Sequence, residues 1–158
     1  TGELMRAAGG AGLPITILTK VRLRETAPKG VTVKVGHMPE AAYAEHRRTP
    51  VHLCPSSYEG FGHYINEARA MGAVIVTTDA APMDELVTTD FGILTPACGT
   101  RQAHAATESI VCVDSLHEAL RACSQLDPEV KRTLGTLARQ AYERDRETFT
   151  KVINELIK

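Results

Sequence analysis

The sequence lacks a large net charge and any long apolar run. Its formal net charge is −1 at pH 7, so nothing general points to nucleic acid or an anionic membrane as a partner. No segment approaches the roughly 18 apolar residues that span a bilayer, and no signal-peptide pattern opens the chain. We therefore expect a soluble, cytoplasmic protein that binds no nucleic acid. Membrane association of a longer parent protein stays open.

Closely spaced metal ligands are also missing. The four cysteines are Cys54, Cys98, Cys112 and Cys123. They form no C-x-x-C pair, and three of them stand in apolar runs or helical patterns, which predicts reduced structural thiols in a reducing compartment. Three of the histidines are His37, His46 and His52. Their spacing is not that of zinc ligands, and they lack acidic or cysteine companions, so no metal site is expected.

The sequence has ordinary globular composition and one recognisable central unit. It is 43% hydrophobic and 23% charged over 158 residues, which predicts one domain with a real core. Residues 51–54 form a short apolar run that Pro55 ends, and residues 74–77 form a β-branched run just after Gly72. An amphipathic helical pattern lies between them. We predict a βαβ unit with parallel strands and a right-handed crossover.

The junction between the first strand and the helix of this unit is where chemistry is expected. Gly60 and Gly62 bracket Phe61 there, so the backbone can adopt positive φ and a ligand can approach the amides. Unpaired N–H groups at a helix start favour an anion such as phosphate. Glu59 precedes this elbow, and Glu67 follows it within the helix. Taken alone, the pattern fits equally well a plain strand–helix turn whose acidic residue only complements the helix dipole.

A longer string around the elbow carries a family resemblance. Its matching residues are Ser56, Ser57, Glu59, Gly60, Phe61, Gly62, Glu67, Ala68, Ala70 and Gly72. They resemble the pattern P-S-x-x-E-G-F-G-x-x-x-x-E-A-x-A-x-G of the retaining GT-B glycosyltransferases of the "glycosyl transferases group 1" type. Glu59 and Glu67 match that family's E-x(7)-E motif. The resemblance implies an α/β fold with a doubly wound, mostly parallel, Rossmann-like sheet, the C-terminal half of a GT-B fold.

The resemblance also implies a domain organisation. Residues 1–158 would form a single Rossmann-like domain that binds the nucleotide-sugar donor, and the N-terminal acceptor-binding domain of the same protein would be missing. The chain opens with Thr1 in a helical pattern, so we expect a fragment without the preceding strand and without the loop whose Arg and Lys embrace the donor pyrophosphate. Such a fragment is expected to be inactive alone.

For function, the resemblance implies transfer of a sugar from a UDP-, GDP- or ADP-linked donor to an unknown acceptor. The reaction would retain the anomeric configuration and need no metal or other cofactor. Glu59 would be the catalytic residue, contacting sugar hydroxyls near the reacting carbon, and Glu67 would accept hydrogen bonds from the ribose hydroxyls. The sugar or distal phosphate of the donor would contact the backbone of Gly60, Phe61, Gly62 and His63.

A second segment of the resemblance concerns the nucleotide base. Gly36, His37 and Met38 follow a strand predicted at residues 31–35 and precede a short helix that ends near Arg47. They resemble the family's F-x-G-x-V segment, whose loop lies against the base. Met38 and the nearby amides could give the apolar contact and the hydrogen bonds that a base needs. A plain strand–helix turn explains the segment about as well.

Some positions depart from the family pattern. Ala81 and Pro82 replace two glycines of the donor-sugar loop, which makes that loop less able to bring amides against a sugar. Glu85 keeps the family's acidic position. Asn66 and Arg69 stand where the family prefers apolar residues, and we expect them to be local differences on the surface.

The remaining segments predict supporting elements. We expect the end of a helix in the first dozen residues, strands at 15–18 and 91–96, a loop over 97–107 and a short strand at 109–113. Asp114 or Ser115 should cap the next helix. Pro128 should open a long helix to Lys158, with a break near Asp145.

The same residues allow two alternatives to the glycosyltransferase interpretation. One is a non-catalytic Rossmann-like module that binds nucleotide or acts as a scaffold, because the acceptor domain and the basic loop have no counterpart here. The other is a dinucleotide-binding oxidoreductase. It is disfavoured, since the G-x-G-x-x-G pattern needs a third glycine where Ile65 stands.

Overall fold

The computed structural model describes residues 2–103 and 106–157. Thr1, residues 104–105 and Lys158 lie outside this description, together with the parts of the sequence predictions that fall on them. In chain order the elements are α1 Gly2–Ala11, β1 Ile15–Thr19, β2 Val31–Val35, α2 Glu40–Arg47, β3 Val51–Cys54, α3 His63–Ala70, β4 Val74–Asp79, α4 Met83–Leu86, β5 Gly92–Ala103, β6 Ala106–Val111, α5 Val113–Gln125 and α6 Pro128–Leu156.

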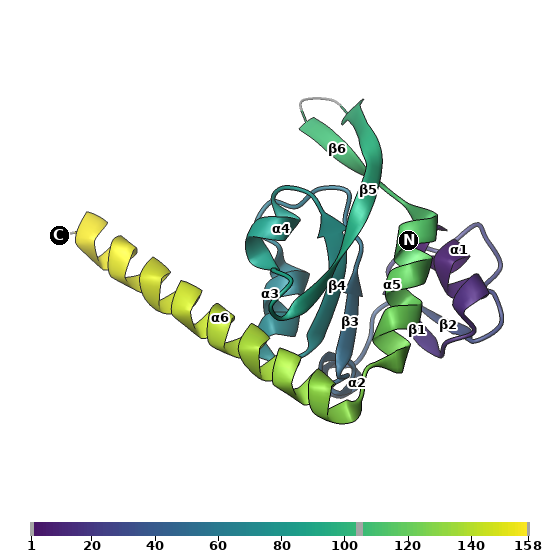
Figure 1. Cartoon of the computed structure of the whole chain (residues 1–158), viewed down its shortest axis with the longest axis horizontal. Helices are drawn as coiled ribbons and strands as arrows, with labels where there is room; N and C mark the ends of the chain where they lie inside the picture. The colour runs from purple at the N-terminus through teal and green to yellow at the C-terminus, as the bar shows by residue number, and fades with distance from the viewer. Residues whose placement is uncertain (1, 104–105, 158) are drawn as a thin grey trace.

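The strands form two sheets (Figure 1). β1 and β2 pair in parallel, while β3, β4 and β5 form a second parallel set to which β6 adds an antiparallel edge. The predicted βαβ unit is confirmed, because β3 pairs with β4 from Val51↔Val74 to Cys54↔Thr77 and α3 connects them. The sheet is therefore mostly parallel as expected, with β1 and β2 as a separate pair.

Helices cover both faces of the central sheet, as a doubly wound fold requires. Val74 and Val76 of β4 pack in a core with α1 and α5, whereas Ile75 packs in a second core with α3, α4 and α6. All three side chains are fully buried. A run of β-branched residues suits a strand that is covered on both faces, and this run fixes β4 at the centre of the fold.

β5 and β6 form a hairpin that projects from the body of the domain (Figure 1). The predicted loop over 97–107 is wrong, because β5 continues to Ala103 and β6 begins at Ala106. Polar pairs across the strands stabilise the hairpin; for example, Arg101 Nε donates to Glu108 Oε2 over 2.7 Å. Such pairs have no apolar period. The predicted strands at 91–96 and 109–113 therefore overlap the start of β5 and the end of β6, while the polar strand residues 97–103 and 106–108 were missed.

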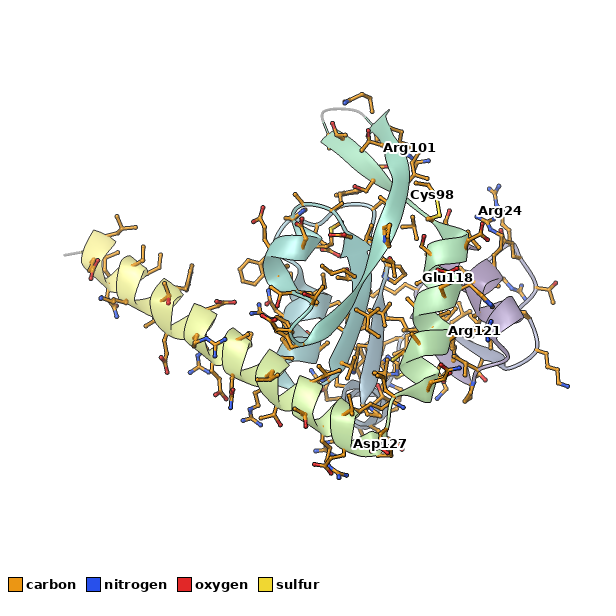
Figure 2. All side chains as sticks on the ribbon, viewed as in Figure 1. Arg24, Cys98, Arg101, Glu118, Arg121 and Asp127 are labelled. Carbon is orange, nitrogen blue, oxygen red and sulfur yellow. A yellow bond between two sulfur atoms is a disulfide. The ribbon has the colours of Figure 1, made fainter. Side chains whose placement is uncertain are left out.

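A disulfide joins Cys98 and Cys112 at the base of the hairpin (Figure 2). The expectation of free thiols is wrong for this pair, because the antiparallel strands bring the two residues to a Cα–Cα distance of 5.0 Å. Cys54 and Cys123 are free and buried, as expected. Burial raises the pKa of both of these thiols. Since disulfides are rare in reducing compartments, the cysteines no longer support a cytoplasmic location.

α5 begins earlier than predicted. Its N-cap is Cys112, which has extended backbone geometry, rather than Asp114 or Ser115. Asp114 instead lies in the first turn, where a carboxylate complements the positive end of the helix dipole. The end of the hairpin strand thus leads directly into the helix.

α6 is one continuous helix of 29 residues, so the predicted break near Asp145 is wrong. Asp127 caps it by accepting from the Glu129 amide over 2.8 Å, and Pro128 occupies the first turn. α6 contacts the domain as far as Asp145, and its C-terminal end extends beyond it (Figure 1). Among the described residues, no helix combines the length and apolar character needed to cross a membrane.

Candidate functional site

The predicted elbow is a tight turn that opens α3. Gly62 is the N-cap of α3 with φ 68° and ψ 44°, the left-handed region that favours glycine, and no side chain caps the helix there. A Cβ on Gly62 would lie 2.3 Å from Leu86 Cδ1. Gly60 lies outside the left-handed region and has open space around it, so the expected positive φ holds for one of the two glycines. α3 therefore begins with amides that suit an anion.

The two glutamates of the motif are each held by a hydroxyl group. Ser56 Oγ donates to Glu59 Oε1 over 2.6 Å just beyond β3, and Tyr43 OH of α2 donates to Glu67 Oε2 over 3.2 Å. Burial first, and then the charge of Glu67, raises the pKa of Tyr43, so the phenol remains a donor. The guanidinium of Arg47 lies 4.7 Å from the centre of the Tyr43 ring. Both carboxylates keep lone pairs for further donors.

A cavity of about 1190 Å³ lies between the two sheets. Its lining includes Gly36, His37 and Met38, which follow β2, together with residues of β1, α2 and β3. Gly36 turns the chain there with φ 109°. Ser56 and Tyr43, which hold the two glutamates, line the same cavity. The predicted base loop and the supports of both carboxylates therefore face one hollow.

The rest of the predicted site lies beside this cavity. Residues 59–63 and Glu67 belong to the described chain and are not part of the cavity lining. Phe61 is 64% exposed, and its ring centre lies 4.9 Å from that of His63, which is exposed too. The structure thus separates the predicted residues into a cavity group at 36–38 and an elbow group at 59–67.

α4 supports the elbow from the other side. Ala81 and Pro82 precede this short helix, with Pro82 as its N-cap. Leu86 at its end occupies the space against Gly62 into which a side chain would otherwise project. Glu85 is exposed. The loop that replaces the family's glycines therefore places an apolar side chain under the elbow.

Sequence reasoning missed a buried polar group on β3. His52 is 2% exposed, and its ring nitrogens lie 3.0 Å from Tyr64 OH and 3.2 Å from the Arg47 carbonyl oxygen. Because a carbonyl only accepts, Nε2 carries the proton and Nδ1 accepts from Tyr64. Burial lowers the pKa of His52 and raises that of Tyr64, so both stay neutral. The burial alternation along β3 could have placed His52 inward, but not its partners.

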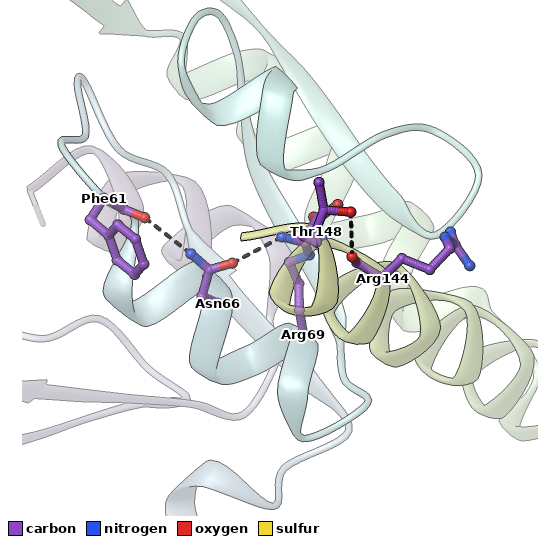
Figure 3. Close-up of polar contacts among 6 residues, drawn as sticks. Phe61, Asn66, Arg69, Arg144 and Thr148 are labelled. Carbon is purple, nitrogen blue, oxygen red and sulfur yellow. Dashed lines mark hydrogen bonds and ion pairs between the residues drawn. The ribbon is translucent and has the colours of Figure 1, made fainter. Parts of the chain in front are cut away.

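Asn66 and Arg69 form a polar chain beneath the elbow (Figure 3). Arg69 Nη1 donates to Asn66 Oδ1 over 2.9 Å, and Asn66 Nδ2 donates to the Phe61 carbonyl over 3.0 Å. Arg69 Nη2 makes an ion pair with Asp145 of α6. The expectation of local surface differences is wrong for Arg69, which is 2% exposed. Asp145 lies 76 residues further along the chain, so the sequence alone gives no sign of this partner.

Metal ligands are not grouped in the part of the chain that the structure describes. Within residues 2–103 and 106–157, no three His, Cys, Asp or Glu side chains are placed to hold one ion.

Known proteins resemble this chain in sequence and in fold. Residues 22–125 match the family described as glycosyl transferases group 1. No curated protein matches the chain significantly. Among solved structures, sucrose-phosphate synthase from Thermosynechococcus elongatus is similar in fold, with a TM-score of 0.67 and 18% sequence identity. The match covers 99% of this chain and 42% of that one, so the chain spans less than half the length of that structure. The predicted α/β, Rossmann-like fold is confirmed.

Proposed function

This chain belongs to the glycosyl transferases group 1 family, and on that premise we propose that it is the donor-binding domain of a retaining glycosyltransferase. The donor we propose is a UDP-, GDP- or ADP-linked sugar. The observation that carries the proposal is the start of α3, where Gly62 leaves the helix amides without a side-chain cap. Glu59 and Glu67 stand on its two sides, each oriented by its own hydroxyl donor.

The donor would extend from the cavity to the elbow. The base would lie against Met38 in the loop after β2, with Gly36 and His37 beside it, because this loop lines a hollow large enough for a nucleotide. The ribose hydroxyls would donate to Glu67, whose other hydrogen bond comes from Tyr43 in the cavity wall. A carboxylate suits a diol because both of its oxygens accept.

The diphosphate and the sugar would lie at the elbow itself. The amides of Gly60, Phe61, Gly62 and His63 are the donors nearest the start of α3, and the helix dipole adds to their attraction for an anion. Glu59 would accept from sugar hydroxyls close to the reacting carbon. When the bond between the anomeric carbon and the phosphate oxygen breaks, the leaving diphosphate gains negative charge. Fixed amides would stabilise that charge without a metal ion. The acceptor hydroxyl oxygen would bond to the same face of the carbon and pass its proton to the departing phosphate oxygen.

The second half of the enzyme would come from an N-terminal acceptor-binding domain of the same protein. The similar solved structure is more than twice as long as this chain, since the match covers 42% of it. The isolated chain is therefore proposed to bind donor without turning it over.

The first test is a titration of the 158-residue chain with UDP, GDP and ADP, followed by thermal unfolding or NMR shifts. We expect one nucleotide to bind with saturation and Glu67→Ala to weaken that binding. The matched control is Glu147→Ala, which removes the same side chain from the exposed part of α6. Equal affinity in wild type and Glu67→Ala would remove Glu67 from the site.

The second test uses the intact parent protein and its nucleotide sugar. Glu59→Ala should abolish most turnover while the nucleotide still binds, because Glu59 is proposed to contact the sugar rather than the ribose. Full activity of this variant would contradict the catalytic role. A parent protein that binds nucleotide and never transfers a sugar would favour the non-catalytic module instead.

A further inference from the structure

The orientation of the Asn66 side chain is fixed by its neighbours. Arg69 only donates hydrogen bonds, so the Asn66 atom 2.9 Å from Arg69 Nη1 must be the amide oxygen. The amide nitrogen is then turned toward the Phe61 carbonyl, 3.0 Å away (Figure 3). The Asn66 backbone amide also donates to the Gly62 carbonyl over 2.8 Å. One residue therefore holds two consecutive carbonyl groups of the elbow.

Arg69 connects this residue to α6. Its side chain is 3% exposed and pairs with the carboxylate of Asp145, which is 64% exposed. The guanidinium carbon lies 5.8 Å from the centre of the Phe91 ring, and Nε is buried without a hydrogen-bond partner. Asp145 thus supplies the negative charge for a buried cation, and a buried cation without a counter-charge is strongly unfavourable. The contact fixes α6 to the helix that carries the elbow.

A second contact brings the backbone of α6 close to the turn after α3. Gly135 lies against Gly72, which follows α3, and a Cβ on Gly135 would be 2.0 Å from the Gly72 carbonyl oxygen. Gly135 and Asp145 are ten residues apart on one continuous helix, a distance of about 15 Å along the axis. α6 therefore meets α3 and its following turn at two separated points.

We propose that Asn66 and Arg69 are positioning residues, which aim the Phe61–Gly62 backbone at the donor and make donor affinity depend on the docking of α6 through Asp145. The inference rests on the proposed donor site at the elbow. The relay, meaning Asn66, Arg69 and Asp145, touches no part of the proposed donor. It acts by keeping the elbow amides in one orientation, so that less ordering is needed when the diphosphate binds.

The first measurement needs no nucleotide. Amide exchange and NMR shifts of residues 61–64 are compared in wild type, Asn66→Leu, Asp145→Asn and Glu143→Gln. Glu143→Gln is the matched control, because it removes a carboxylate from the same helix whose partner, Arg139, belongs to α6 itself. We expect faster exchange and shifted signals in the first two variants only. Unchanged elbow amides in folded Asn66→Leu would overturn the proposal.

The second measurement separates positioning from simple loss of structure. Binding of UDP, GDP and ADP is compared with binding of the corresponding nucleosides in the same variants. We expect diphosphate affinity to fall about fivefold to tenfold in Asn66→Leu and in Asp145→Asn, with nucleoside affinity unchanged. The double variant should bind about as well as either single variant, because both changes break one relay. Additive losses, or equal losses for nucleosides, would refute it.

The exchange measurement is independent of the proposed function, whereas the binding measurement depends on it. If wild type binds none of the nucleotides, the donor site fails and the exchange measurement alone decides the relay. Asn66→Leu keeps the Arg69–Asp145 ion pair, so it remains usable if Asp145→Asn does not fold.

Discussion

The elbow glycines allow one prediction to be worked out from the structure, because only Gly62 needs to be glycine. Its φ of 68° lies in the left-handed region, which costs a residue with a side chain about 1–2 kcal/mol. A Cβ would also lie 2.3 Å from Leu86 Cδ1. That atom ends a flexible side chain, so the clash belongs at the low end of the usual overpacking cost of about 1–3 kcal/mol.

Gly62→Ala should therefore destabilise the fold by about 2–3 kcal/mol, as the sum of the backbone and the overpacking costs. For a domain of this size that corresponds to a Tm lower by about 4–12 °C. Gly60→Ala is the matched control, since Gly60 has nothing within 4 Å of an added Cβ and does not need positive φ. It should be neutral or stabilise by up to about 1 kcal/mol through the unfolded chain.

Thermal and urea unfolding of both variants by circular dichroism measures these differences. Leu86→Ala in the Gly62→Ala background separates the two costs, because it removes the clash and leaves the backbone strain. Nucleotide titration should show that Gly62→Ala also weakens diphosphate binding. Equal destabilisation by the two alanines would refute the assignment of strain to Gly62.

Three further predictions concern stability. Gly135→Ala should lower the free energy of unfolding by about 2 kcal/mol, because overpacking against a rigid backbone carbonyl 2.0 Å away exceeds the roughly 1 kcal/mol gained in helix propensity. Urea unfolding measures this free energy, and a more stable variant would contradict the prediction. Burial lowers the pKa of His52, so the unfolded chain binds a proton at this residue before the folded chain does, and stability should fall as the pH drops through about 6.5. The free energy of unfolding between pH 5 and 8 should depend less steeply on pH in His52→Gln. An unchanged slope would exclude His52 as a source of the pH dependence. Reduction of Cys98–Cys112, which closes a loop with a sequence separation of 14, should cost about 3 kcal/mol, and the double serine variant should unfold identically with and without reductant.

Local sequence patterns predicted the elements whose side chains repeat with a clear period. The β-branched run of β4 and the apolar run of β3 gave the central βαβ unit, because such runs suit buried parallel strands. α5 has an apolar face at helical spacing, formed by Leu116, Ala119 and Leu120, and all three are buried. Burial on one face or both leaves a signal in the sequence, and that signal is enough to place these elements.

The polar part of the hairpin, residues 97–103 and 106–108, had no such signal. Most side chains of β5 beyond Ala97 are exposed, and their stability comes from cross-strand pairs and from the Cys98–Cys112 bond. Each of these contacts depends on a register that only the folded strands define. A segment with polar side chains on both faces therefore resembles a loop until its partner strand is known.

In the candidate site, too, local features could be predicted and contacts between distant segments could not. The left-handed glycine at the start of α3 could be predicted from one short stretch, and the same stretch places the two glutamates beside it. The binding roles of the glutamates rest on the family resemblance and stay a proposal. The groups that orient them come from elsewhere: Tyr43 reaches Glu67 from α2, and Asp145 reaches Arg69 from α6.

Arg69 illustrates why such partners escape a reading of the sequence. An arginine on a short amphipathic helix is ordinarily solvated, since burying its charge without a partner is costly. Its burial here is possible only because α6 runs unbroken past α3 and brings a carboxylate to it. α6 continues past Asp145 because residues 136–156 contain neither proline nor glycine, and this continuity keeps the Asp145 carboxylate within reach of Arg69. The departure from the family pattern at Arg69 and the unbroken course of a distant helix are thus linked by one ion pair.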